Sequence, residues 1–393
     1  MIKIAERLQR VEEYYFSKKL EEIRQMREQG KEVLNLGIGS PDLPPEEGVV
    51  QELVDSASKN EHHAYQPYRS TIELRDSMSR FYFNTFGVKL NPDEEILPLL
   101  GSKEGVMYIS MAFLNPGDIV LVPNPGYPAY AAIANLLGAE VVEYNLKEEN
   151  NWYPDFEELE KIDLVKVKMM WVNYPHMPTG APATNELFHD LVDFARKNEI
   201  LLCNDNPYSQ VLNSSPVSIL KFDADLSHVI ELNSLSKSFN MAGWRVGMVL
   251  GHKKYIDGIL QAKSNVDSGM FLPIQHAAAK ALQLKQEWHD ERNEIYEARR
   301  AKATKILEDI GCTIRPHQVG MFVWAKVSDK VADTHELIDD LLHNAQVFIT
   351  PGEVFGSNGK RFIRLSLCSD EKIYDKAIAN IKIWQDRKLQ LAL

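Results

Sequence analysis

Short apolar segments recur through the middle of the chain, and helical patterns separate them. The segments cover residues 119–122, 141–144, 168–172, 200–203, 229–232 and 246–250. They are rich in β-branched residues and do not alternate cleanly between apolar and polar positions, which is typical of strands buried on both faces. Strands that alternate with helices predict a mostly parallel sheet with helices on both sides. This pattern therefore predicts an α/β fold.

The two ends of the chain have a different pattern, and a length of 393 residues suits about two domains. Residues 1–30 are predicted to be helical. A helix predicted at 283–309 leads into a region where short predicted strands, at 321–324 and 361–365, alternate with helices at 333–345 and 370–387. We predict a large α/β domain over residues 47–285. Residues 286–393 are predicted to form a smaller α+β domain together with an N-terminal arm, residues 1–46.

Composition limits the partners and the compartment. The formal net charge of −12 argues against a nucleic acid or an anionic membrane as the main partner. Cys203, Cys312 and Cys368 form no C-x-x-C pair, which excludes a cysteine zinc site of the usual spacing and favours a reducing compartment. The N-terminus lacks the apolar core of a secretory signal, and no segment has the ~18 apolar residues of a membrane span. We therefore expect a cytoplasmic protein.

The segment around Lys237 carries the strongest chemical signal. It reads S-L-S-K-S-F-N-M-A-G-W-R-V-G over residues 234–247, so that the lysine lies between serines and Arg245 follows it. A lysine amine attacks carbonyls when burial or neighbouring cations depress its pKa. Hydroxyls and a guanidinium are natural ligands for phosphate. A carbonyl compound that carries a phosphate and is held as a Schiff base is pyridoxal 5′-phosphate (PLP), which we predict as the cofactor.

Polar residues follow several predicted strands, at the carboxyl ends where ligands bind in open α/β sheets. Asp205 follows the segment 200–203, and burying a carboxylate there is costly unless it has a partner. The protonated ring nitrogen of PLP would be such a partner. The alternative is an aspartate that caps the following turn. Tyr208 is either a donor to the PLP 3′-oxygen or an aromatic residue packed in a loop.

Three further features are ambiguous when each is taken alone. The run G-S-K-E-G at residues 101–105 resembles a phosphate cradle at the start of a helix, although it lacks the spacing of a P-loop. Tyr127, in N-P-G-Y-P, either stacks on a cofactor ring or occupies a turn. Arg364 lies inside a predicted strand and is either the receptor for a substrate α-carboxylate or half of an ion pair.

Taken in order, these motifs resemble the class I/II aminotransferases of PLP fold type I over essentially the whole chain. The resemblance is greatest to LL-diaminopimelate aminotransferases and aspartate-aminotransferase-like enzymes. The motifs that carry it are L-G-I-G-S-P-D-L-P (36–44), G-S-K-E-G (101–105), N-P-G-Y-P (124–128), P-T-G (178–180), N-D-N-P-Y (204–208), the Lys237 segment and K-S-N-V-D-S-G (263–269). The resemblance implies a seven-stranded, mostly parallel sheet between helices, plus the smaller α+β domain.

The resemblance also implies a role for each matched residue. Lys237 would form the Schiff base and then move the proton, while Asp205 would pair with the ring nitrogen and Tyr208 with the 3′-oxygen. Tyr127 would stack on the ring. The residues implied to hold the phosphate are Ser102, Lys103, Ser234, Ser236, Arg245 and, from the second subunit of a homodimer with shared active sites, Tyr65. The residues implied to contact the substrate are Gly39 and Arg364, at its carboxylate, and Asn265 and Tyr14.

One position departs from the family pattern. The usual Asn-Pro-Thr-Gly becomes Met177-Pro178-Thr179-Gly180, and a thioether cannot donate the hydrogen bonds that the asparagine gives to the 3′-oxygen and to the substrate carboxylate. We expect the pKa of the Lys237–PLP imine to be higher than in relatives with asparagine, and carboxylate binding to depend more on Arg364. Asn173 and His176 are neighbours that are able to compensate.

The leading hypothesis is therefore a PLP-dependent aminotransferase that works by a ping-pong mechanism between an L-amino acid and a 2-oxo acid. LL-diaminopimelate and aspartate- or glutamate-type compounds are the substrates that the resemblance implies. A PLP-dependent carbon–sulfur lyase is the second hypothesis, and it would release pyruvate and ammonia without an acceptor. A non-catalytic PLP-binding protein is the third.

Overall fold

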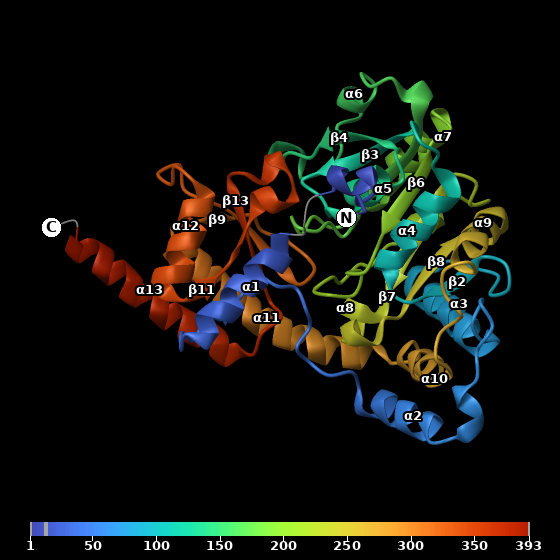
Figure 1. Ribbon diagram of the computed structural model, residues 1–393, viewed down its shortest axis with the longest axis horizontal. Coiled ribbons are helices and arrows are strands. Elements are labelled where there is room, and N and C mark those ends of the chain that lie inside the picture. The colour runs from blue at the N-terminus through green and yellow to red at the C-terminus, as the bar shows by residue number, and fades with distance from the viewer. Residues whose placement is uncertain (1, 12–14, 392–393) are drawn as a thin grey trace.

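The computed structural model describes residues 2–11 and 15–391 (Figure 1). Among these residues, a seven-stranded sheet has the strand order β2-β8-β7-β6-β5-β3-β4. In this sheet β8 runs opposite to the other six strands, which are parallel to one another. The strands are β2 (Ile96–Leu99), β3 (Ile119–Asn124), β4 (Glu140–Asn145), β5 (Val167–Val172), β6 (Leu201–Asp205), β7 (Val229–Ser234) and β8 (Gly247–Gly251). The prediction of a mostly parallel, seven-stranded sheet is confirmed.

Both faces of the sheet are buried, as the strand composition indicated. In β5, Met169 and Trp171 join one apolar cluster, while Met170 and Val172 join the other. Successive side chains of a strand point to opposite faces, so both faces require apolar residues. The sequence pattern did not reveal β2, because this four-residue edge strand contains Pro98, a residue tolerated in sheets mainly at edges.

Helices cover the two faces of this sheet. α4, α5 and α9 contribute to the cluster on one face, and α3 and α7 contribute to the cluster on the other. The helices of this part of the chain are α2 (Glu47–Ala57), α3 (Ile72–Phe86), α4 (Ser102–Phe113), α5 (Ala129–Leu136), α6 (Phe156–Leu159), α7 (Asn185–Lys197), α8 (Leu235–Ser238), α9 (Lys253–Lys263) and α10 (Leu272–Ala281).

The C-terminal part forms a second layer of strands and helices beside the first (Figure 1). Its antiparallel sheet has the order β12-β13-β10-β9. Its elements are α11 (Gln286–Asp309), β9 (Thr313–Ile314), β10 (Phe322–Lys326), α12 (Thr334–Asp340), β11 (Val347–Phe348), β12 (Thr350–Pro351), β13 (Phe362–Ser366) and α13 (Glu371–Leu391). The domain boundaries at 46/47 and 285/286 stay a prediction.

The N-terminal arm packs against this second part, because β1 (Leu34–Asn35) pairs in parallel with β11. The expectation of one helix over residues 1–30 is too long. A 3₁₀ turn covers Glu6–Arg10 and α1 covers Tyr15–Glu28, with residues 12–14 outside the described ranges. Within those ranges, no helix combines the length and the apolar character needed to cross a membrane.

Candidate active site

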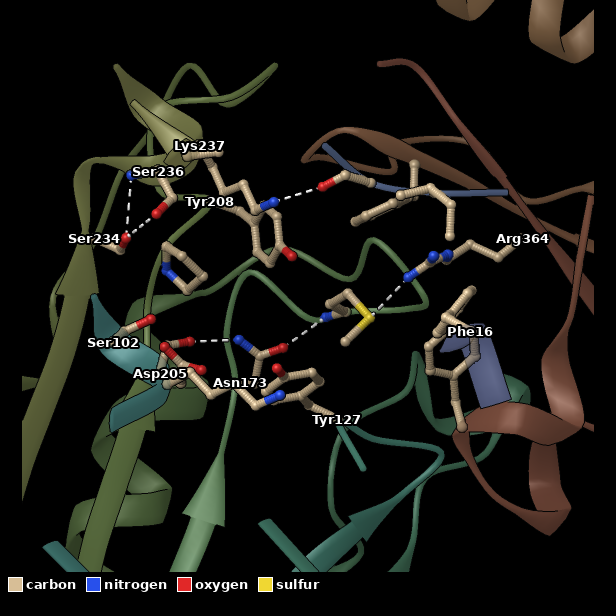
Figure 2. Close-up of a pocket in the computed structure, with 18 of the residues that line it drawn as sticks. Phe16, Ser102, Tyr127, Asn173, Asp205, Tyr208, Ser234, Ser236, Lys237 and Arg364 are labelled. Atoms are coloured by element: carbon tan, nitrogen blue, oxygen red, sulfur yellow. Dashed lines mark hydrogen bonds between the residues drawn. The ribbon is translucent and has the colours of Figure 1, made fainter. Parts of the chain in front are cut away.

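A cavity of about 500 Å³ lies at the carboxyl ends of the parallel strands, where the second part of the chain faces the large sheet (Figure 2). This volume is within the range of ligand sites in proteins. Ser102, Ser234 and Ser236 lie on one side of the cavity, and Arg364 lies on the other (Figure 2). Segments that are far apart in the sequence therefore meet at one site, as the strand-end argument predicted.

The serine side of the cavity is a cradle of hydroxyls, a guanidinium and a helix start. Ser234 caps α8, since its Oγ accepts from the Ser236 amide at 3.1 Å and donates to Ser236 Oγ at 2.8 Å. Arg245 reaches Ser236 Oγ at 3.5 Å. Gly101 has φ of +95°, and a Cβ there would lie 2.1 Å from Arg245 Nη2. The glycine lets Arg245 approach the start of α4, where Ser102 and Lys103 line the cavity.

Lys237 projects into the same cavity from α8. Its Nζ donates to the carbonyl of Gly39, a residue of the arm, at 2.5 Å. Burial lowers the pKa of Lys237, and the positive charges of Arg364 and Arg245 act in the same direction, against the nearby Cys368. A lysine amine whose pKa is depressed in this way is a better nucleophile and base near neutral pH.

Asp205, at the end of β6, presents one free carboxylate oxygen to the cavity. Oδ2 accepts from Tyr130 Oη at 2.9 Å, whereas Oδ1 is buried without a hydrogen-bond partner among the described residues. Burial raises the pKa of Asp205 to about 7; the hydrogen bond from Tyr130 opposes this shift and the Glu231 carboxylate adds to it. A buried acceptor without a partner is costly, so this geometry suits a ligand that brings a donor.

Aromatic side chains hold this carboxylate in place. Tyr130 stacks on Trp171 with ring centroids 4.9 Å apart and an interplanar angle of 2°. Tyr127 packs edge-on against Tyr130 at 5.5 Å and lines the cavity, as does Tyr208. Burial raises the pKa of Tyr208, so that its hydroxyl stays protonated and able to donate. The sequence did not predict Tyr130 as a site residue, because nothing in its local pattern distinguishes it from other tyrosines. Only the fold brings it next to Asp205 at the end of β6.

Arg364 forms the opposite end of the cavity. Its Nη2 donates to the Gly37 carbonyl at 2.8 Å, and its Nη1 lies 3.3 Å from Met177 Sδ. Phe322 and Phe355 lie with their ring centroids 4.0 and 4.6 Å from the guanidinium carbon. The choice between a carboxylate receptor and half of an ion pair stays a prediction; the recorded acceptors of Arg364 include a carbonyl and a thioether.

Two of the predicted residues that the structure describes do not line this cavity. Tyr65 is 89% exposed. Asn265 is also exposed, and its side chain donates to Gln261 O within its own helix turn at 2.8 Å. Tyr14 lies outside the described residues. Every other predicted site residue lines the cavity.

A profile of the family described as "Aminotransferase class I and II" matches residues 31–381. The chain belongs to the class I and II aminotransferases. It is 38% identical over 382 residues to a protein named LL-diaminopimelate aminotransferase from Dehalococcoides mccartyi, covering 97% of this chain and 98% of the relative. A protein of the same name from Aquifex aeolicus is 36% identical, with 98% and 100% covered. A substrate-bound structure of BacF from Bacillus subtilis superposes with a TM-score of 0.92 at 34% identity, covering 97% of each chain.

This aminotransferase uses PLP, as the family does. The cavity fits the cofactor, because its free Asp205 Oδ1 suits a protonated ring nitrogen. The serines, Arg245 and the start of α4 suit a phosphate. The Lys237 amine lies between these two groups and the Arg364 end of the cavity (Figure 2).

The two neighbours that could compensate for Met177, Asn173 and His176, are both buried in this aminotransferase. The Asn173 side chain is committed to the backbone, since it donates to the Asp205 carbonyl and its Oδ1 accepts from the Met177 amide at 2.9 Å. His176 is buried, and its Nδ1 lies 2.8 Å from Thr179 Oγ1. Burial lowers the pKa of His176 to about 3, so that its ring is neutral.

Tyr130→Phe tests the support of Asp205. Removing the hydroxyl takes away the bond that lowers the Asp205 pKa, so the pKa rises above about 7 and more of the carboxyl is neutral at pH 7. A neutral carboxyl pairs less well with a protonated ring nitrogen. We expect PLP to bind the apoenzyme about tenfold more weakly at pH 7, which corresponds to ~1.4 kcal/mol, with a smaller deficit as the pH rises. Fluorescence titration with PLP measures this.

The matched control is Tyr144→Phe, which removes another buried hydroxyl, bonded to the Trp171 carbonyl at 2.8 Å. Its PLP affinity is expected to match that of the wild type. Equal weakening in both variants would show a general packing effect and contradict a specific role for Tyr130.

Met177→Asn tests the departure from the family pattern. An added donor to the ring oxygen, worth ~1–3 kcal/mol, weakens the hold of that oxygen on the neighbouring imine proton. The pH midpoint of the absorbance change of bound PLP is expected to fall by about one unit. A spectrophotometric pH titration measures it, and Met177→Leu is the control without a donor. An unchanged or higher pH midpoint in the asparagine variant would contradict the expected effect of Met177 on the imine pKa.

Proposed function

We propose that this aminotransferase exchanges an amino group between an L-amino acid and a 2-oxo acid in two half-reactions, with Lys237 as the residue that binds PLP and moves the proton. Support comes mainly from one observation: the Lys237 amine and the free Asp205 oxygen face the same cavity as the hydroxyl and guanidinium cradle. When bound, PLP supplies an electron sink that weakens the bonds at the substrate Cα.

The residues of the chain supply the remaining work. The depressed pKa of Lys237 favours a neutral amine. This amine would act as the base that takes the proton from the substrate Cα and then as the acid that donates it in the 1,3-proton shift. Asp205 keeps a proton on the ring nitrogen by accepting it in a hydrogen bond at Oδ1. The Tyr208 hydroxyl donates to the ring oxygen. Arg364 orients the substrate by donating two parallel N–H groups to its α-carboxylate, which replaces the weak thioether acceptor of Met177.

The substrates to test first follow from the relatives. LL-diaminopimelate is the donor named for the Dehalococcoides mccartyi and Aquifex aeolicus relatives. Aspartate and glutamate are the donors that the motif resemblance implies, with 2-oxoglutarate as the acceptor. Location in the cytoplasm stays a prediction.

Lys237→Ala is the decisive variant. The wild-type enzyme is expected to convert bound PLP to pyridoxamine phosphate with an amino donor alone, and to regain PLP with a 2-oxo acid. The variant is expected to lose at least about 10³-fold in rate, because it lacks both nucleophile and base. Absorbance spectra follow both half-reactions, and Lys254→Ala, at an exposed lysine, is the control. Release of pyruvate and ammonia without an acceptor would indicate a lyase instead.

We further propose a homodimer with shared active sites. Apolar side chains gather, exposed, on and beside α2 and α10, two helices that pack together. The exposed residues are Val50, Val54, Tyr65, Tyr68 and Phe271. Apolar exposure of this extent in one region is typical of a protein interface. Tyr65 belongs to this face and not to the cavity of its own chain, which supports its role in the partner's site.

Subunit mixing tests this arrangement. A Lys237→Ala protein and a Tyr65→Ala protein are each expected to have low activity. In a hybrid dimer, the chain that keeps Lys237 receives Tyr65 from its partner, so one of its two sites is intact. Reversible dissociation of an equal mixture should therefore restore about a quarter of the wild-type activity, as a random isologous dimer requires. No recovery would place Tyr65 in its own chain's site or outside the site.

A further inference from the structure

The walls around Arg364 are aromatic and aliphatic. Phe322 and Phe355 cover the guanidinium at 4.0 and 4.6 Å, and the ring of Phe16 lies 5.6 Å from it. The thioether of Met177 touches its Nη1 at 3.3 Å. A carboxylate bound by this arginine would therefore lie among apolar side chains.

The same character continues to the mouth of the cavity. Leu20 and Phe16 enter from α1, and Ile38 enters from the arm. Phe16 packs against Phe355, with ring centroids 6.3 Å apart, so that α1 and the C-terminal part form one continuous wall. Leu20 is 45% exposed, so its side chain is accessible to a ligand in the cavity.

Each positively charged side chain that lines the cavity already has a role in the proposed function. Among the described lining residues, the cations are Lys103, Lys237, Arg245 and Arg364. Lys103 and Arg245 lie beside the serine cradle, Lys237 carries the chemistry and Arg364 takes the α-carboxylate in the proposed function. None of these cations, all from one chain, is left for a second carboxylate on the substrate. Burying a carboxylate without a cation or several donors is strongly unfavourable.

We propose that one of the two substrate pairs of this enzyme has an apolar side chain, aliphatic or aromatic, which packs against Phe16, Leu20, Ile38 and Phe355. This inference rests on the proposed aminotransferase function and deepens it. Met177 contributes to the same preference, because it replaces a polar amide with a thioether at the edge of Arg364. Apolar contact with these walls is the source of selectivity, and it grows with the apolar area that the substrate side chain buries.

Binding of carboxylates that lack an amino group tests the pocket without turnover. The probes are propionate, 3-phenylpropionate and glutarate, titrated into the PLP-loaded enzyme by calorimetry. We expect 3-phenylpropionate to bind at least tenfold more tightly than propionate, and glutarate to gain less than threefold. Glutarate binding more tightly than 3-phenylpropionate would overturn the inference and would show that a cation from elsewhere, such as a second subunit, faces the pocket.

Single-turnover rates then connect the pocket to the reaction. L-phenylalanine and L-leucine are expected to convert bound PLP to pyridoxamine phosphate at least tenfold more efficiently than L-alanine. Leu20→Arg is expected to reduce this ratio at least fivefold and to improve L-glutamate as a donor. The control is Val165→Arg, which makes the same charge change at a side chain that is 95% exposed and does not line the cavity.

The outcomes separate the two proposals. If L-glutamate or LL-diaminopimelate reacts while L-phenylalanine and L-leucine react no better than L-alanine, the apolar preference is wrong and the aminotransferase function stands. If no amino acid converts the cofactor, the proposed function fails, and the substrate inference fails with it. A ratio that Leu20→Arg leaves unchanged would remove α1 from the selective wall.

Discussion

The burial of an acid and a base in one cavity is the constraint on which the site depends. Asp205 and Lys237 both lie where water is scarce, and burial disfavours the charged form of each, raising the pKa of the aspartate and lowering that of the lysine. Both pKa shifts serve the enzyme. A neutral lysine is a reactive nucleophile, and a buried carboxylate is stabilised by a cationic partner such as a protonated ring nitrogen. The rest of the fold serves to hold these two groups in place at the end of a rigid sheet.

That rigidity comes from a polar network inside an apolar sheet. Glu231 on β7 is fully buried beside β6, and its carboxylate accepts hydrogen bonds from Tyr82, Asn204, Ser218 and the amide of Ile219. These bonds join α3, β6 and the segment after β6. On the other face, Tyr130 stacked on Trp171 fixes the Asp205 carboxylate. Satisfied buried networks of this kind specify one arrangement, since breaking any member leaves a buried donor without a partner.

The two ends of the cavity obey different physics. The serine end offers hydroxyls, a guanidinium and the amides of a helix start, which favour an anion with several oxygens. The Arg364 end offers a single guanidinium enclosed by phenyl rings and a thioether. A cation is attracted electrostatically to aromatic faces, while its surroundings remain apolar. The Arg364 end of the site therefore combines a guanidinium that can bind a carboxylate with an apolar environment for the rest of the ligand.

Much of this could be predicted from the sequence. The β-branched segments fixed the α/β class because strands buried on both faces need apolar residues at every position, and the Lys237 segment named the cofactor because few residue sets suit a carbonyl and a phosphate together. Tyr130, Phe16 and Phe355 could not be predicted as site residues, because aromatic residues in helices and turns look alike until folding brings them together. The tertiary structure alone decided that the Asn173 side chain bonds the backbone, and that Tyr65 is exposed and does not line the cavity of its own chain. Those outcomes depend on contacts between segments far apart in the sequence, which no local pattern encodes.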